Sequence, residues 1–246
     1  AERESNERRA LTIARALSAD VDRELTAIIT TLETLATSRA LTAGDYATFH
    51  AQAKEALKSR SWNVVLIDAA GQQRVNTRLP WGTALPLTAA TEPPLPQIVR
   101  QTEQPYISDL FVGTVAKRQI FAVAVPVRIG EEAPSALVMS LEPERLVEVL
   151  NEGGIPDGWL AAISDRNNIN MARSRFAARF VGQRVPSESL RQYAGRPEGV
   201  ITTTDFEGQH SLHAFHFSRL SGWRMAAWAP LPVVEAPLRQ AWTLFL

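Results

Sequence analysis

Polar and aromatic side chains gather in two short stretches of the chain and together suggest a binding site for a small molecule. In chain order the candidates are Asn76, Arg78, Trp81, Tyr106, Ser108 and Asp109. The planar guanidinium of Arg78 suits a carboxylate, whereas the carboxylate of Asp109 suits an ammonium group. Polar groups that converge beside an aromatic wall are typical of concave small-molecule sites. The sequence therefore predicts a site for an organic acid, an amine or an amino-acid-like molecule.

Two phenylalanines extend this candidate site. Phe111 and Phe121 are included as wall residues, although the hydrophobic core is the alternative place for both. The polar candidates have a structural alternative as well. Trp81 can simply close the core, and Arg78 with Asp109 can form a surface ion pair worth about 0 to 1 kcal/mol.

The chain has none of the common catalytic or phosphate-binding motifs. It lacks GxSxG, GxxxxGK[ST], HExxH and GxGxxG. His210, His213 and His216 invite a metal hypothesis, but steps of three along a strand place His213 on the face opposite the other two. Two histidines alone rarely make a metal site. We predict no catalytic residue, no metal and no cofactor.

Two further sets of residues in the second half of the chain receive structural interpretations. The arginines suggest either an anion site or a solvated basic loop, and we favour the loop for Arg173, Arg175 and Arg179. The tryptophans are predicted to pack in the core: Trp159, Trp223 and Trp228.

Composition limits the possible partners. Lys plus Arg and Asp plus Glu both number 26 among the 246 residues, so the chain has no net positive charge with which to bind a nucleic acid backbone. It has no cysteine, which excludes disulfides and thiolate catalysis and agrees with an oxidising compartment. We predict no nucleic acid partner.

The elements that would position the candidate site occur twice in the sequence. A strand, a tight turn and a second strand at 61–78 lead to a hairpin pair at 111–128 and 135–143. The same plan returns at 157–175, 206–220 and 222–232, with Trp62 and Asp68 matching Trp159 and Asp165 at one constant offset. The repeat predicts two similar antiparallel sheets, because its length exceeds the period of about 20 to 50 residues that is typical of solenoids.

A long helix precedes both copies. Apolar positions recur at alternating steps of three and four, interrupted only by a serine: Leu11, Ala14, Ser18, Val21, Leu25, Ile28, Leu32 and Leu35. This stripe predicts a helix over 4–38 that either covers the sheets of its own chain or pairs with a second copy. A second helix is expected over 45–56, and a short one over 97–102.

The quoted motifs resemble those of a known family. DxxGxxxxNTRLPWGTxLP, YISDLFVG, AVAVPVR and SLEPERL, followed by GWLAAISDRN, ARSRFAARFVGQ and LSGWRMAAWAP, are similar to the double Cache sensor domains of bacterial transmembrane receptors. The likeness is strongest to those of sensor histidine kinases. In one respect the chain departs from the amino-acid-binding pattern of that family, because Gly82 follows Trp81 and two residues separate the tryptophan from Arg78.

The resemblance implies an α+β fold in which a long N-terminal helix is followed by two PAS-like modules, each an antiparallel sheet flanked by helices. We expect a stalk helix at 1–40, a membrane-distal ligand-binding module at 41–150, a membrane-proximal module at 151–232 and a C-terminal helix at 233–246. Flanking membrane spans would anchor the domain in the periplasm. A homodimer is expected to form through the N-terminal helix.

The expected function is that of a non-enzymatic input domain. It would sense a small molecule in the distal module and signal to the output domain of a two-component histidine kinase. Three alternatives stay open: an input domain of a chemoreceptor or cyclic-dinucleotide enzyme, a soluble periplasmic binding or adaptor protein, and a dimerisation domain without ligand.

Overall fold

The computed structural model describes residues 2–60, 62–88, 91, 93–130 and 134–235, and it divides into two compact units. The unit that we call the first module is Arg23–Pro143, and the second module combines Ala1–Asp22 with Glu144–Leu246. Each module is an antiparallel sheet with helices packed on it, so the α+β class and the pair of PAS-like modules are confirmed.

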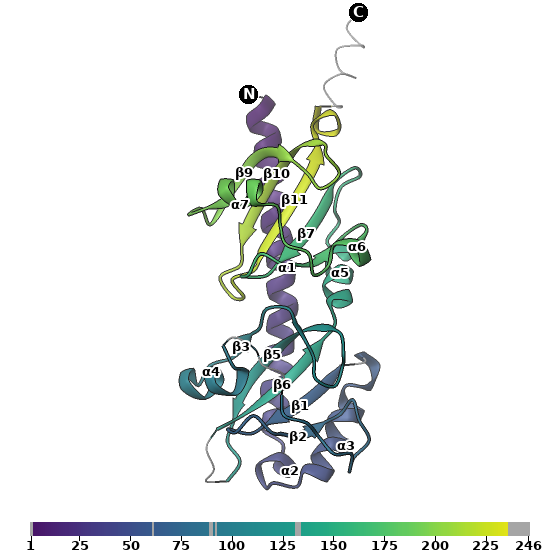
Figure 1. Ribbon diagram of the computed structural model, residues 1–246, viewed down its shortest axis with the longest axis vertical. Coiled ribbons are helices and arrows are strands. Elements are labelled where there is room, and N and C mark those ends of the chain that lie inside the picture. The colour runs from purple at the N-terminus through teal and green to yellow at the C-terminus, as the bar shows by residue number, and fades with distance from the viewer. Residues whose placement is uncertain (1, 61, 89–90, 92, 131–133, 236–246) are drawn as a thin grey trace, which may run out of the picture. The chain divides into compact units, whose positions relative to one another are not determined.

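Helix α1 (Glu2–Ala36) contributes to the cores of both modules (Figure 1). Its buried stripe includes Ala14, Val21, Leu25, Ile28 and Leu32, as the spacing predicts, each with no exposed surface. The ends of the predicted stripe, Leu11 and Leu35, are only partly buried. Because the middle of the stripe is buried within the chain, it covers the chain's own sheets, and a dimer through α1 would have to use the other side of the helix.

The first module places its helices around a twisted sheet. Helices α2 (Arg39–Thr42) and α3 (Tyr46–Ala56) and the 3-10 turn η1 (Lys58–Arg60) precede the first strand. Asp45 caps α3 by accepting a hydrogen bond from the Thr48 amide at 3.1 Å. Helix α4 (Leu95–Thr102) begins two residues earlier than the sequence predicts, because Pro96 is compatible with the first turn of a helix.

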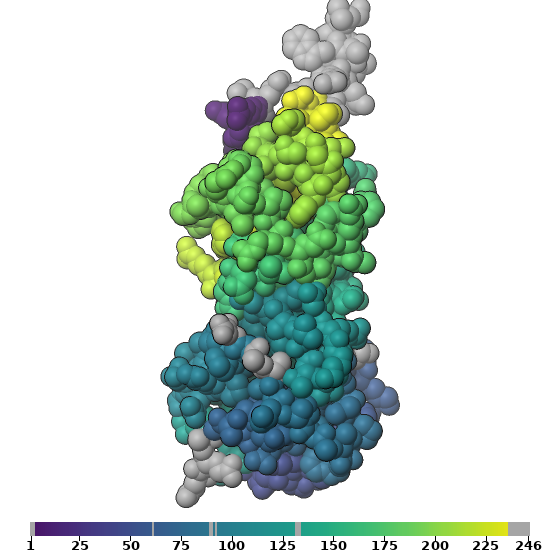
Figure 2. Space-filling model, viewed as in Figure 1, coloured from purple at the N-terminus to yellow at the C-terminus, as the bar shows by residue number. Residues whose placement is uncertain are grey.

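Strand order in the first module is β2-β1-β6-β5-β3, with β4 also pairing with β5. The strands are β1 (Asn63–Ile67), β2 (Gln73–Asn76), β3 (Tyr106–Ile107), β4 (Phe111–Val112), β5 (Gln119–Val127) and β6 (Ser135–Leu141). The central strands β1, β5 and β6 are almost wholly buried, which agrees with their continuous apolar runs. Figure 2 shows the face of this module that is turned to the viewer, coloured blue to teal.

The second module repeats this strand order as β8-β7-β11-β10-β9. Helix α5 (Pro143–Glu152) leads into β7 (Leu160–Ser164) and β8 (Asn170–Arg173), and α6 (Ala177–Phe180) and α7 (Ser187–Tyr193) follow. The sheet is completed by β9 (Glu198–Thr204), β10 (His210–Phe217) and β11 (Arg224–Pro230). The sequence analysis did not assign β9, although its run of β-branched residues over 200–204 is typical of a strand.

Acidic residues close tight turns in both modules by the same local chemistry. Asp68 Oδ1 accepts hydrogen bonds from the Ala70 and Gln72 amides, both at 2.9 Å. Asp205 does the same for the Glu207 and Gln209 amides at 3.0 and 2.8 Å. Burial opposes the ionised form of Asp68, but its hydrogen bonds and Arg74 hold the net pKa below the ordinary value. These aspartates fix the turns between the paired strands.

Within the residues that the structure describes, no helix is both long and apolar enough to cross a membrane. Residues 231–235 after β11 are helical. The rest of the expected C-terminal helix at 233–246 lies outside the described residues.

Candidate functional site

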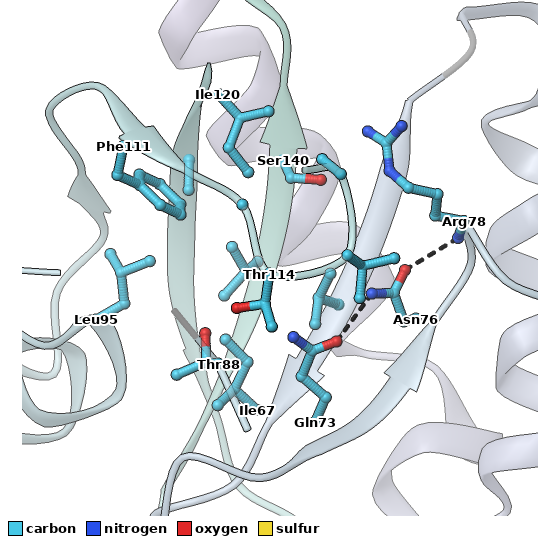
Figure 3. Close-up of a pocket in the computed structure, with 16 residues that line it drawn as sticks. Ile67, Gln73, Asn76, Arg78, Thr88, Leu95, Phe111, Thr114, Ile120 and Ser140 are labelled. Atoms are coloured by element: carbon cyan, nitrogen blue, oxygen red, sulfur yellow. Dashed lines mark hydrogen bonds between the residues drawn. The ribbon is translucent and has the colours of Figure 1, made fainter. Parts of the chain in front are cut away.

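A cavity opens on the sheet of the first module, between the strands and the segments that cover them (Figure 3). It holds about 450 Å³ of empty space, part of it open to solvent. Its lining includes Val65, Ile67, Gln73, Asn76, Arg78, Thr88, Leu95, Phe111, Gly113, Thr114, Val115, Ala116, Ile120, Ala122, Val138 and Ser140. Three of the sequence-predicted residues, Asn76, Arg78 and Phe111, belong to this set.

The cavity has an apolar side and a polar side. In Figure 3, Phe111 and Leu95 lie on one side, and Asn76 and Arg78 lie on the other. Apolar residues of β1, β5 and β6 form part of the same buried cluster on which Phe111 packs. A ligand that fits both sides therefore needs an apolar body and a polar head.

Hydrogen bonds fix the amide groups on the polar side. The Asn76 Nδ2 group donates to Gln73 Oε1 at 2.8 Å, and the Arg78 amide donates to Asn76 Oδ1 at 3.0 Å (Figure 3). Both amide side chains are buried, at 7% exposure for Gln73 and 5% for Asn76. Each amide oxygen keeps a second lone pair with which it can accept from a ligand.

Among the described residues that line the cavity, Arg78 is the charged one. Its ion pair with Glu142 is long. Both of its terminal nitrogens lie 3.4 Å from Glu142 Oε1, longer than the distance of about 2.7–2.9 Å that is typical of charge-assisted hydrogen bonds. Arg118 donates to the same Glu142 oxygen. Two guanidinium groups thus share one carboxylate, which leaves positive charge at the cavity for an anionic group.

The Pro-rich segment before α4 is held against the edge of the sheet. Gln72 Nε2 donates to the Leu85 and Pro86 carbonyl oxygens at 2.9 and 3.2 Å, and the Thr88 amide donates to the Gly71 carbonyl oxygen at 2.8 Å. This anchoring places Thr88 at the cavity. This long connection, for which the sequence predicts no helix or strand before α4, therefore forms part of the cavity wall.

A tight loop over 113–118 forms another part of the wall. The Gly113 amide donates to the Arg118 carbonyl oxygen at 3.0 Å, and the Lys117 amide donates to the Gly113 carbonyl oxygen at 2.9 Å. A Cβ atom on Gly113 would lie 2.6 Å from the Ile120 Cδ1 atom, so any other residue at this position requires the Ile120 side chain to move. The loop brings Thr114 to the cavity, a residue that no sequence signal selects.

Five sequence-predicted residues lie outside the lining. Trp81 is 52% exposed, and its ring stands 5.7 Å from that of His50, which in turn contacts the Leu79 carbonyl oxygen at 2.9 Å. Tyr106 packs on the buried cluster beside the cavity. Asp109 is half-buried and does not line the cavity.

The remaining two predicted residues, Ser108 and Phe121, are buried and contact other parts of the protein interior. Ser108 Oγ accepts from the Ala122 amide and donates to the Asp109 carbonyl oxygen, both at 2.8 Å. Phe121 is fully buried, and strand alternation turns it away from Ala122, which lines the cavity. For these five residues a part in binding stays a prediction.

The second module corrects one interpretation and confirms another. Arg173 is not part of a solvated loop: it is 1% exposed, because aromatic rings cover it and Glu207 Oε1 accepts from its Nη2 at 2.6 Å. Arg175 and Arg179 are both exposed, as the solvated-loop interpretation predicts. The predicted core tryptophans are buried, at 7% for Trp159, none for Trp223 and 4% for Trp228.

The histidines of β10 alternate in burial. His213 is 7% exposed, whereas His210 is exposed and His216 is half-buried. Among the residues that the structure describes, no three His, Cys, Asp or Glu side chains gather in a way that could hold a metal ion.

The solved structures that are similar to this chain include an extracellular domain, a sensory domain and a ligand-binding domain of different receptors. The extracellular domain of rpHK1S-Z16, named as a putative histidine kinase, has a TM-score of 0.69 at 12% identity, covering 94% of this chain and 95% of its own. The sensory domain of the Campylobacter jejuni chemoreceptor Tlp3 with isoleucine bound has a TM-score of 0.70 at 12% identity, with coverages of 94% and 95%. The ligand-binding domain of the Pseudomonas fluorescens chemoreceptor CtaA in complex with L-isoleucine has a TM-score of 0.69 at 12% identity. The match covers 95% of this chain and 96% of that domain.

No protein-family model and no curated protein matches the chain in sequence. At these identities the structural likeness establishes the fold. The chain therefore shares the fold of these sensor and ligand-binding domains, in agreement with the double Cache resemblance of its sequence.

Proposed function

We propose that the chain is the periplasmic input domain of a membrane receptor and that it binds a small carboxylate-bearing, amino-acid-like molecule in the first module. The observation that carries the ligand class is Arg78, a cation in the cavity lining whose acidic partner, Glu142, is shared with Arg118. The similar domains of Tlp3 and CtaA were solved with isoleucine bound, which supports the same class here.

The polar side of the cavity matches such a ligand. A ligand carboxylate would accept from Arg78, and its amine would donate to the second lone pairs of the Gln73 and Asn76 amide oxygens. The apolar body would lie on Phe111 and Leu95. Asp109, the predicted ammonium partner, lies outside the lining, so the amide oxygens take over that role in this proposal.

The ligand proposal is tested by calorimetric titration of the domain with the standard amino acids and their des-amino acids. Arg78→Gln should weaken the best ligand by about tenfold or more, because it removes a charge-assisted contact. Glu142→Gln should act in the opposite direction, because it frees Arg78 from its competing carboxylate. Thermal unfolding without ligand checks that both variants are folded.

The sign of the Glu142→Gln effect decides whether Arg78 holds the ligand. If both substitutions weaken binding equally, or neither changes it, Arg78 does not contact the ligand.

Trp81→Ala and Asp109→Ala test the wider site that the sequence predicted. They should leave affinity unchanged if the ligand lies in the cavity, and weaken it if the sequence-predicted site is the true one.

We further propose that the output is a histidine kinase and that membrane spans flank the domain. The similarity to the extracellular domain of rpHK1S-Z16 supports this choice, while chemoreceptor domains of equal similarity support the alternative. Binding can signal only if two conformations bind the ligand with different affinity. Ligand-dependent autophosphorylation of the full-length receptor in membrane vesicles would test the kinase, and its absence alongside ligand binding would favour a chemoreceptor.

A homodimer through α1 stays part of this proposal. Since the apolar stripe of α1 is buried in the chain, the dimer would use the exposed side of the helix, where Ala16, Arg23 and Ala27 lie. Sedimentation velocity of the domain with Ala27→Glu should show loss of a dimer. An unchanged mass relative to the natural chain would rule out this interface.

A further inference from the structure

The second module holds a cavity of its own, with about 460 Å³ of empty space, part of it open to solvent. Its lining is Ala162, Ser164, Asn170, Val185, Pro186, Ser189, Tyr193, Thr204, Asp205, Phe206, His213, Arg224, Ala226 and Trp228. From its sequence, Trp228 is a predicted core residue, and no ligand is predicted for this module. The function proposed above does not use this cavity.

Strand pairing shows that the two cavities occupy the same place in the two modules. Val65 pairs with Val138 in the first sheet, and Ala162 pairs with Ala226 in the second. All four residues line their cavities. Both modules therefore have a cavity at the equivalent position of the sheet, but the residues that line it differ.

The lining residues differ most in size at two further pairs of equivalent positions. Ala122 pairs with Ser140 across β5 and β6, and His213 pairs with Trp228 across β10 and β11. An alanine and a serine in the first cavity thus correspond to a histidine and a tryptophan in the second. The second cavity is accordingly more aromatic at this end.

Arg224 provides a buried cation at one end of the second cavity. It is 3% exposed, and its guanidinium donates to Ser164 Oγ at 2.7 Å and to Asn168 Oδ1 at 3.1 Å, both uncharged acceptors. Burial lowers the pKa of Arg224, and the attraction of Tyr193 and Asp165 offsets this only in part. A buried cation in this state gains from an anionic ligand.

Asp205 lines the cavity as well, but it already accepts three hydrogen bonds. They come from the Glu207 and Gln209 amides and from Ser211 Oγ. Its charge disfavours a second carboxylate on the ligand, and three of its roughly four acceptor positions are already used. The charges therefore favour one negative group on the ligand and leave at most one acceptor position for a positive one.

The remaining walls are apolar and aromatic, with polar atoms that the described protein leaves unmatched. Trp228 and His213 stack at 5.4 Å with 13° between their planes, and neither Trp228 Nε1 nor His213 Nε2 has a partner among the described residues. Both side chains are more than nine-tenths buried. Buried polar groups of this kind usually have a partner in proteins.

We propose that this second cavity is a binding site for a small monocarboxylic acid with a short apolar body. The carboxylate accepts from Arg224, with the Ser189 and Tyr193 hydroxyls beside it in the lining. The apolar body lies along Ala162 and Ala226 towards the aromatic end. The proposal is independent of whether the first cavity binds an amino-acid-like ligand.

The test uses the whole domain and three probes of similar shape: butyrate, the uncharged butyramide and the zwitterion 2-aminobutyrate. Calorimetric titration should show binding of butyrate, and about tenfold or weaker binding of the other two. Methyl-¹³C methionine spectra locate the ligand, because Met139 belongs to the first module and Met171 and Met225 to the second. Butyrate should shift the Met171 and Met225 signals and leave that of Met139 in place.

Matched substitutions separate this site from the first one. Ala226→Leu fills the second cavity and should weaken butyrate about tenfold or more, whereas Val138→Phe at the equivalent position fills the first cavity and should leave butyrate binding intact. Arg224→Lys keeps the charge and should retain part of the affinity if Ala226→Leu proves unfolded.

Three results would overturn the proposal: no butyrate binding, equal binding of butyramide, or butyrate binding that Val138→Phe abolishes and Ala226→Leu does not. Loss of amino acid binding in Val138→Phe alone would bear only on the function proposed for the first module. The two proposals therefore fail independently.

Discussion

The imidazole of His213 lies flat against Trp228, and burial lowers its pKa from 6.5 to about 4, with Arg173 acting in the same direction and Asp205 against it. The folded chain therefore holds this histidine neutral at pH values where the unfolded chain has already bound a proton. The contribution of His213 to the free energy of unfolding is fully present above about pH 6.5 and is lost as the pH falls towards about 4.

The first prediction concerns acid stability. Because the unfolded state takes up one more proton, the free energy of unfolding of the natural chain should fall by about 2 kcal/mol more than that of His213→Gln between pH 7.5 and pH 5. Urea unfolding at the two pH values measures the difference. His210→Gln, which changes an exposed histidine of the same strand, is the control. Parallel pH profiles for His213→Gln and the natural chain would contradict the assignment.

A second prediction for a single residue concerns Ser18 in α1. Its side chain is 2% exposed, and its hydroxyl has no hydrogen-bond partner among the described residues. Ser18→Ala should raise the free energy of unfolding by about 1 kcal/mol, because it removes an unmatched buried polar group and improves helix propensity. Thr12→Ala on the exposed side of α1 should show the helix-propensity part alone, a gain of about 0.5 kcal/mol. A destabilised Ser18→Ala variant would mean that the hydroxyl has a partner.

Among the elements, the 113–118 loop has the most direct effect on the candidate site. A methyl group on Gly113 would lie 2.6 Å from the Ile120 Cδ1 atom, so Gly113→Ala should displace the Ile120 side chain, which, like Thr114, lines the cavity. We expect ligand affinity in the first module to fall about tenfold or more, with a stability loss of about 1 to 3 kcal/mol. Val112→Ala changes the adjacent exposed residue and is the control. Unchanged affinity in Gly113→Ala would exclude the loop from the site.

A β-bulge explains why the sequence did not reveal Gln73 on the polar side of the cavity. Gln73 and Asn76 are three residues apart in β2, and simple alternation places them on opposite faces. The register shifts between Leu66 and Ile67, so the pairing of β1 with β2 gains one residue and the two amides meet on one face. The second module has the same shift between Ile163 and Ser164. Asn76 was selected from its type, but its partner Gln73 was not.

For the chain as a whole, α1 determines how the protein can be divided. Leu25, Ile28 and Leu32 belong to the first module and have no exposed surface. A boundary at residue 40, as the sequence suggested, would remove all three from that core. Each buried side chain contributes about 1.5 to 3 kcal/mol, which together is comparable to the whole stability of a small domain.

The last prediction follows from this division. A chain of residues 23–143 should fold cooperatively, because it keeps its half of α1. A chain of residues 41–150 should not, because its sheet loses that cover. Thermal unfolding followed by circular dichroism and the dispersion of amide NMR signals distinguish the two. Equal cooperativity in both chains would show that α1 is not required by the first module.

Local patterns in the sequence were enough to predict the long helix, the two sheets and their internal resemblance. These features depend on periodicity and on turn residues such as Asp68 and Asp165, which act over a few positions. The same patterns marked Asn76, Arg78 and Phe111, which the folded chain brings to one cavity. Local signals were sufficient here because strand direction and turn type follow from neighbouring residues.

The folded chain was needed to show which polar residues share a cavity and which groups the two cavity-lining arginines contact. Arg78 pairs with Glu142, where the sequence analysis suggested Asp109, and Arg224 lies buried beside Ser164. Nothing in the sequence around either arginine indicates these partners. The contacts join residues about 60 positions apart (142 and 78, 224 and 164) through strand pairing and a bulge. Binding chemistry arises from such long-range geometry, whereas the fold class follows from short-range pattern.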